Sequence, residues 1–329
     1  MTCDTMTPPS LETALETRLD GDADIQAIIR ETQALIARRD YGQALAFLDA
    51  SLDRLASDEG FAPVFRDDSG AEYRSFQNTF EEALYFFLHK PAREVKRLPK
   101  DFFGLYVLRG WLLFEMRRFD EAGDALKKAI RLNPINSEAV LELAEISKMH
   151  GDWGGFLDLT LWVLERAYTG ADVGRSYRNL AFYCVEKLNY ALAVVLLHCS
   201  RLFDPESALA RTELLFIHEL TGAPVLPPSM DEIAVALEAS GLPFGGSEAV
   251  VGIALALGRI ATKEGITEEV EFCEGVLREV AFDERILLAD QPQISGAPQV
   301  FQMKGYSPFD LLTPPWTTML PTMCIPSCP

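Results

Sequence analysis

Apolar side chains recur every three or four residues along most of this chain, from about residue 24 to residue 289. That spacing predicts helices that each bury one stripe of side chains. The stripes and their breaks place helices at about 24–57 (two helices), 71–89, 102–117, 119–132, 137–150, 153–167, 173–187, 189–203, 206–221, 229–240, 247–263 and 267–289. Asn133-Pro134 and Asp204-Pro205 end two of them, since proline lacks the donor needed to continue a helix.

The middle of the chain repeats one signature with a period of 34 residues: a small residue, and a packing partner 12 positions later. The pairs are Gly110 and Ala122, Ala144 and Phe156, and Ala181 and Ala193. An aromatic residue lies three positions before the second member of each pair: Phe119, Trp153 and Tyr190. The third copy is displaced by 37 because residues 169–172 form a small insertion, and Thr32 with Ala44 marks a divergent fourth copy. Such a period predicts helical hairpins that stack to bury their apolar faces.

This signature resembles the tetratricopeptide repeat. The clearest copy, residues 103–136, carries Tyr106, Gly110, Leu113, Ala122, Leu126, Ala129 and Pro134 at the offsets of that repeat. It departs from the pattern at Arg109, where leucine is usual, and the second copy departs at Phe156, which predicts looser or shifted packing there. The likeness covers about 100 residues strongly and about 220 with divergent flanks. It implies an all-α fold, an α–α superhelical solenoid of tetratricopeptide-like hairpins.

Composition and proline content divide the chain into four parts. We expect a flexible N-terminus at 1–22, repeats at 23–222 (clearest at 103–205, with an insertion at 58–101), divergent C-terminal helical hairpins at 223–290, and a Pro-rich tail at 291–329. The tail is apolar, with Lys304 and Asp310 as its charged residues, which is unusual for a disordered segment. One hypothesis is that residues 300–320 dock on the solenoid; the other is that the tail is not a natural terminus.

The formal net charge is −19, which opposes binding to DNA, RNA or anionic membranes. The charge indicates either solubility alone or a preference for basic partners. A basic cluster at 90–100 is expected to pair with the acidic C-terminal half or to bind an acidic partner or phosphate. Six scattered cysteines and the absence of a secretory signal predict a cytoplasmic protein. The longest apolar run, 249–258, is too short to cross a bilayer, which takes about 20 residues.

In the tetratricopeptide family the first helix of each hairpin lines a concave groove, and this resemblance implies the candidate site. By position, the partner-binding residues would be Trp111, Phe114, Lys148, Arg175, Arg178, Asn179 and Phe182, with Val107, Leu141 and Glu145 beside them. The arginines and Asn179 could hold a carboxylate or peptide backbone, and the aromatic residues could supply apolar contacts. The alternatives are a solvated polar face and aromatic rings that pack within the protein.

The sequence therefore predicts a protein–protein interaction scaffold that binds a peptide or partner segment in a helix-lined groove. The alternative is a regulator whose solenoid changes curvature when it binds a peptide signal. An enzyme is not expected, because no phosphate loop or nucleophile elbow is present, and Gly222 stands where the motif begun by His218-Glu219 needs its second histidine. No cofactor and no metal site is predicted. The partner's identity and the oligomeric state stay open.

Overall fold

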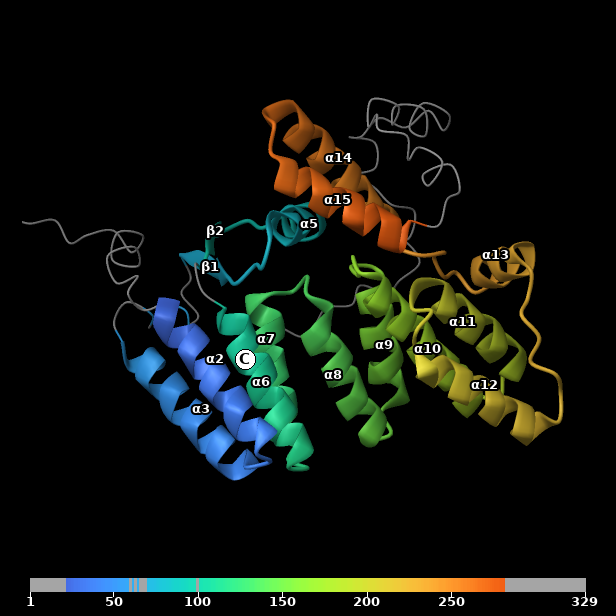
Figure 1. Ribbon diagram of the computed structural model, residues 1–329, viewed down its shortest axis with the longest axis horizontal. Helices are drawn as coiled ribbons and strands as arrows, with labels where there is room; N and C mark the ends of the chain where they lie inside the picture. Colours follow the sequence, from blue (N-terminus) through green and yellow to red (C-terminus); the bar gives the residue numbers. More distant parts are fainter. Residues whose placement is uncertain (1–21, 59–60, 62–63, 65–69, 99–100, 282–329) are drawn as a thin grey trace, which may run out of the picture.

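The computed structural model describes residues 22–58, 61, 64, 70–98 and 101–281. Paired antiparallel helices follow one another along a row, so the fold is the predicted all-α solenoid (Figure 1). The row consists of α2 (Asp22–Ala37), α3 (Tyr41–Ser57), α6 (Phe102–Glu115), α7 (Phe119–Leu132), α8 (Ser137–Met149), α9 (Trp153–Leu164), α10 (Gly170–Glu186), α11 (Tyr190–Phe203) and α12 (Ala208–Thr221). Asp22 begins α2; the rest of the predicted flexible N-terminus and the whole 291–329 tail lie outside the described residues.

One backbone geometry recurs in the turns of the four hairpins. The residue two positions before the aromatic at the start of each second helix has a positive φ, between 60° and 70°. These residues are Arg39, Arg117, Gly151 and Leu188, so a glycine takes this left-handed position in one turn of the four. The next residue caps the second helix through its side chain in three turns, from Asp40, Asp152 and Asn189. A common turn of this kind gives each hairpin the same tight reversal.

The paired small residues of the signature lie where the two helices of a hairpin meet. A Cβ added to Gly110 would approach Leu126 Cδ2 to 2.7 Å, so glycine permits the close contact of α6 with α7. Ala122 is completely buried opposite it. Phe156, the exception to the pattern, is also completely buried, and its ring contacts the rings of Trp153 and Phe182. The larger side chain therefore extends the packing of α9 to the next hairpin.

The segment between α3 and α6 corrects the predicted helix at 71–89. Residues Ala71–Arg74 form strand β1, α5 spans Thr79–His89, and Glu94–Arg97 form strand β2, which pairs with β1 in parallel. Alternate residues of β1 are buried, which is the period of a strand. Asn78 then starts the helix by accepting a hydrogen bond from the Glu81 backbone N–H. The prediction failed because apolar side chains at 73, 76 and 80 also fit a helical spacing.

The C-terminal helices leave the row and return across it. Beyond α12 lie α13 (Met230–Ala239), α14 (Glu248–Glu264) and α15 (Thr267–Val280). The α14–α15 hairpin packs on α5 and lies above the row in Figure 1. The Phe272 ring centroid lies 6.0 Å from that of Phe80, and Thr79 donates a hydrogen bond of 2.9 Å to Glu269. The inserted α5 thus joins the segment between α3 and α6 to the α14–α15 hairpin.

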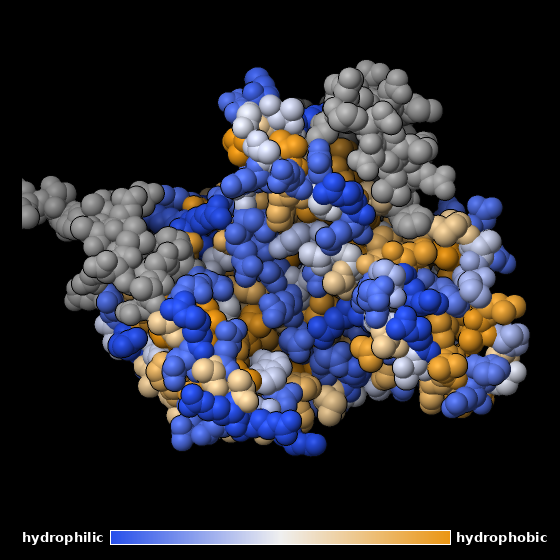
Figure 2. Space-filling model, viewed as in Figure 1, coloured by the Kyte–Doolittle hydropathy of each residue, from blue (hydrophilic) through white to orange (hydrophobic). Residues whose placement is uncertain are grey.

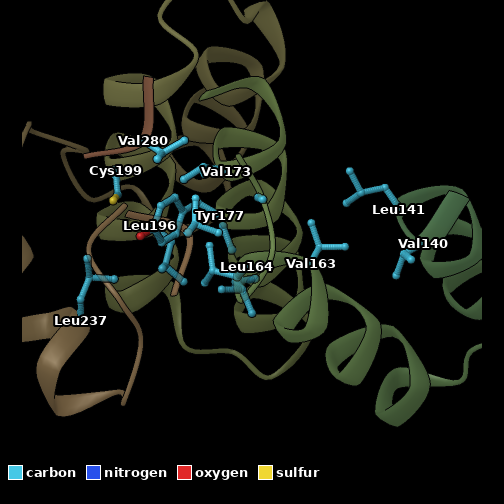
Figure 3. Close-up of a cluster of buried hydrophobic side chains, with 14 of the residues drawn as sticks. Val140, Leu141, Val163, Leu164, Val173, Tyr177, Leu196, Cys199, Leu237 and Val280 are labelled. Atoms are coloured by element: carbon cyan, nitrogen blue, oxygen red, sulfur yellow. The ribbon is translucent and has the colours of Figure 1, made fainter. Parts of the chain in front are cut away.

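Two apolar cores run through the molecule. One lies among α2, α3, α6 and α7, and includes Leu48, Phe103 and Leu113. The other joins α5 and the helices from α8 to α15, and Figure 3 shows part of it around Tyr177. Tyr177 is completely buried against Phe203, with 5.8 Å between the ring centroids. The second core therefore holds the returning C-terminal hairpin as well as the last repeats.

We expect Tyr177→Phe to lower the free energy of unfolding by about 1–3 kcal/mol. The hydroxyl donates to the Pro243 carbonyl oxygen at 2.5 Å and accepts from the Gly245 N–H at 2.9 Å, so its removal leaves both backbone groups unpaired. Urea unfolding measures the change. Tyr183→Phe, on the same helix and partly exposed, is the control and should change stability by less than about 0.5 kcal/mol. Equal effects of the two variants would contradict the role given to the Tyr177 hydroxyl.

Candidate functional site

A surface groove of about 460 Å³ opens between α10 and α12. Its walls and mouth are formed by Phe182, Val185, Glu186, Leu188, Tyr190, Glu213, Phe216 and Leu220. α10 is the first helix of the last hairpin, and α12 is the helix that follows that hairpin in the row. Figure 2 shows apolar surface gathered over the end of the molecule that holds α11 and α12.

The α12 side of the groove arises from a helix with two apolar stripes. Ala210, Leu214 and Ile217 are buried, and among the described helices α11 is the one that packs extensively on α12. A second stripe, at positions i, i+4, i+7 and i+11, consists of Leu209, Glu213, Phe216 and Leu220. Its three apolar members are 63%, 54% and 53% exposed. The apolar side chains of the second stripe are therefore exposed, and its members Glu213, Phe216 and Leu220 line the groove.

The chain turns away after Gly222, so α12 does not form a hairpin with the helix that follows it. Gly222 ends the helix with a φ of 66°, and residues 222–229 run without regular structure. Pro227 and Pro228 in this stretch cannot continue a helix. The next helix, α13, packs on α11 instead of pairing with α12 in a hairpin. α12 is therefore the last helix of the row, and its outer face is not covered by a further hairpin of the described residues.

The groove carries two carboxylates, Glu186 and Glu213, and no basic residue among those that line it. Partial burial raises the pKa of Glu213 above its ordinary value; Glu145 adds to this increase, and the positive charges of Arg178 and Lys148 oppose it. Within the described part of the chain, no hydrogen bond or ion pair engages the carboxylate of either lining glutamate. The groove is therefore apolar with unpaired negative charge.

Among the predicted partner-binding residues, Phe182 lies in the groove wall, and Lys148 lies against it. The Lys148 ammonium nitrogen lies 4.9 Å from the centroid of the Phe182 ring and pairs with the carboxylate of Glu145. The Phe182 ring also contacts Trp153, at 5.9 Å between centroids. The structure thus brings together two of the predicted residues, from α8 and α10.

The two arginines of α10 have different surroundings. Arg178 donates to Asp204 Oδ2 at 2.8 Å and to Ser200 Oγ at 3.2 Å, and its side chain is 11% exposed. These bonds join α10 to α11, so Arg178 stabilises the hairpin. Arg175 is more exposed and pairs with Glu142 on α8, with a distance of 2.9 Å from Nη1 to Oε1. Its guanidinium reaches across from one hairpin to the previous one.

Asn179, between these arginines, is 7% exposed, and its Nδ2 atom has no hydrogen-bond partner among the described residues. A buried amide without a partner costs free energy. It lies one helical turn before Phe182 on the same helix. Asn179 is therefore next to the groove wall with an unused donor.

Trp111 and Phe114 lie against the other core and do not join the groove. The Trp111 ring meets Tyr41 of α3 edge to face at 5.8 Å, and the Phe114 ring meets Phe119 of α7 at 5.3 Å. Both side chains are partly buried against the α2–α7 core. Val107 and Leu141, expected beside them on the surface, are 8% and 1% exposed, so their side chains belong to the interior.

The basic cluster at 90–100 finds its acidic partners within its own segment. Arg93, Lys96 and Arg97 form ion pairs with Glu72, Glu94 and Glu82. The prediction had paired these residues with the acidic C-terminal half, or alternatively with an acidic partner or phosphate. The strand at 71–74, which the sequence pattern did not reveal, explains the difference because it places Glu72 beside β2.

Titratable groups elsewhere show the effect of burial. Burial raises the pKa of the Cys199 thiol to about 12 and that of Cys273 to about 11, which keeps both protonated near neutral pH. Burial lowers the pKa of His89 to about 4, with the charge of Arg166 as the next cause. No group of three or more potential metal ligands occurs in the described ranges. No described helix has both the length and the apolar composition needed to cross a bilayer.

Sequence reasoning missed most of the groove residues. It missed Val185, Glu186, Leu188 and Tyr190 at the end of α10 and the start of α11, and Glu213, Phe216 and Leu220 on α12. A signal was present on α12, because its apolar residues exceed what one buried stripe needs. The second stripe indicates a second contact surface.

Comparison with known proteins adds little detail. No protein-family model matches the chain, and no curated protein matches it. A solved structure that is similar is the crystal structure of YrrB, described as a TPR protein with an unusual peptide-binding site. It is 20% identical, the match covers 63% of this chain and 98% of that chain, and the TM-score is 0.32. At so low a score the fold assignment rests on the helices of this chain, which form a solenoid of tetratricopeptide-like hairpins.

Proposed function

We propose that this chain is a protein-interaction scaffold that holds a segment of a partner polypeptide in the groove between α10 and α12. The observation that carries the proposal is the open, apolar groove of about 460 Å³ beside the unpaired outer stripe of α12. Exposed apolar surface of this kind is costly in water and is typical of an interaction site. A groove between two helices suits a helical or extended segment that inserts side chains at regular spacing.

The predicted residues divide between this site and the scaffold. Phe182 forms part of the groove wall, and Lys148 and Arg175 extend the proposed surface toward α8. Asn179 is buried beside this wall, so a contact with the partner would need its side chain to move outward. Arg178 holds α10 to α11, and its role in the proposal is to keep the wall in position.

Phe216→Asp is expected to weaken binding of groove ligands by at least about 30-fold, because it places a charge at an apolar anchor. Ligands are obtained by selecting 16-residue peptides displayed on phage against the full chain, and affinity is measured by fluorescence polarisation. Leu215→Asp is the control: Leu215 is 60% exposed on the same helix but does not line the groove. Its affinities should stay within about threefold of the unmodified chain.

Two results would contradict the proposal. One is a selection that yields no binding peptide. The other is a set of peptides whose affinity is reduced equally by Phe216→Asp and Leu215→Asp, since that would place the binding surface elsewhere.

A further inference from the structure

Given the proposed function, we infer that the groove selects a cationic amphipathic partner, a segment that carries apolar side chains on one face with lysine or arginine beside them. The proposal assigns Glu186 and Glu213 as the residues that recognise the positive charge. It rests on the proposed function because it names the chemistry of the segment that fills the same groove.

The first argument is the cost of the unpaired carboxylates. Glu213 is partly buried, whereas Glu186 is exposed, and neither carboxylate has a hydrogen bond or ion pair within the described part of the chain. Removing a carboxylate from water is unfavourable unless an opposite charge or a hydrogen bond compensates it. An occupant without a positive charge would exclude more water and increase that cost. An occupant with an ammonium or guanidinium group would offset it.

The second argument is that nearby cations are already engaged. Lys148 pairs with Glu145 and lies over the ring of Phe182. Arg178 is bonded to Asp204 and lies within the hairpin. The positive charges closest to Glu213 are thus committed to other carboxylates. A partner would supply the missing charge.

The third argument is the arrangement of apolar and acidic positions along the wall. On α12, Leu209, Phe216 and Leu220 flank Glu213 on one stripe. On α10, Phe182 and Val185 precede Glu186. Each wall thus presents apolar contacts interrupted by a carboxylate. The complementary ligand has apolar anchors interrupted by a cation, and the net charge of −19 attracts such a segment at long range.

A biased peptide library tests this inference on the full chain. Each 16-residue peptide has leucine at positions i, i+3, i+4 and i+7 of a helix, and its other positions are Lys, Gln or Glu in equal amounts. Deep sequencing compares clones bound to the unmodified chain, to the double variant Glu186→Gln/Glu213→Gln, and to Glu219→Gln with Glu268→Gln. The last pair is the matched control, because it removes the same charge from exposed positions outside the groove lining.

The inference predicts that Lys is enriched over Gln in bound clones by about two- to fivefold, the upper range of a partly exposed ion pair. The enrichment should disappear with the groove variant and persist with the control. Equal recovery of Lys and Gln, or equal loss of enrichment in both variants, would overturn the assignment of Glu186 and Glu213. Peptides that still lose binding with Phe216→Asp would then leave the proposed function intact. Recovery of no peptide would overturn both.

Discussion

Phe80→Ala should lower the free energy of unfolding by about 3–5 kcal/mol, the usual cost of removing a buried aromatic side chain. Phe80 is completely buried in α5. Its ring centroid lies 5.3 Å from that of Tyr168, in the segment between α9 and α10, and 6.0 Å from that of Phe272 on α15. The substitution therefore leaves a cavity where the insert, the row of hairpins and the returning hairpin meet.

Urea unfolding followed by circular dichroism measures this change, and amide hydrogen exchange locates it. Exchange should accelerate most in α5, α14 and α15, because these helices lose their shared contact. The control is Phe86→Ala, a substitution on the same helix at a side chain that is 45% exposed, with an expected cost below about 1 kcal/mol. A comparable loss of stability from both variants would show that the contacts of Phe80 with Tyr168 and Phe272 do not contribute more than an exposed ring does.

Glu81→Ala should be nearly as damaging, with a loss of about 3–5 kcal/mol. The carboxylate is completely buried and accepts four hydrogen bonds. The Gln77 N–H and the Asn133 side chain donate to Oε2 at 2.6 and 2.8 Å, and the Asn136 side chain and Tyr168 hydroxyl donate to Oε1 at 3.2 and 2.8 Å. Without Glu81 these four hydrogen bonds lose their acceptor, although the Asn133 side chain keeps its bond of 3.2 Å to the Ser75 carbonyl oxygen.

The adjacent residue gives a matched comparison. Glu82 makes an ion pair with Arg97 at 3.2 Å, and its side chain is 32% exposed. Glu82→Ala should cost less than about 1 kcal/mol, because a partly exposed ion pair contributes little. Chemical unfolding of the two single variants separates them. A loss below about 1 kcal/mol for Glu81→Ala would mean that water or side-chain rearrangement satisfies the four donors.

The solenoid could be predicted from the sequence because its information is local and repeated. Gly110 and Ala122 meet as the signature required, and Tyr41, Phe119, Trp153 and Tyr190 all begin second helices. Periodic apolar spacing and small residues at fixed offsets are enough to specify stacked hairpins. The all-α fold class is therefore confirmed, although a two-stranded sheet occurs in the insert.

The groove and the insert depended on contacts between distant residues, which one sequence does not reveal. The carboxylate of Glu81 accepts a hydrogen bond from Tyr168, 87 positions away, and the repeat signature does not predict that bond. The predicted surface residues were chosen by their offset in a repeat, but Val107 and Leu141 are interior because neighbouring hairpins cover them. Phe182 was among the predicted residues because it lies on the first helix of the third copy of the repeat. Phe216 was missed because the repeat signature fades before α12.

The contact of α5 with α14 and α15 turns a row that would otherwise be open at both ends into a tethered assembly. An untethered stack of hairpins behaves as a spring, since each unit touches its neighbours alone. Here Thr79 and Phe80 of α5 contact Glu269 and Phe272 of α15. Extending the row of hairpins would therefore require these contacts to break. A partner that acts by extending the solenoid would have to break the contact between α5 and the α14–α15 hairpin. A partner that binds between α10 and α12 can bind without breaking it.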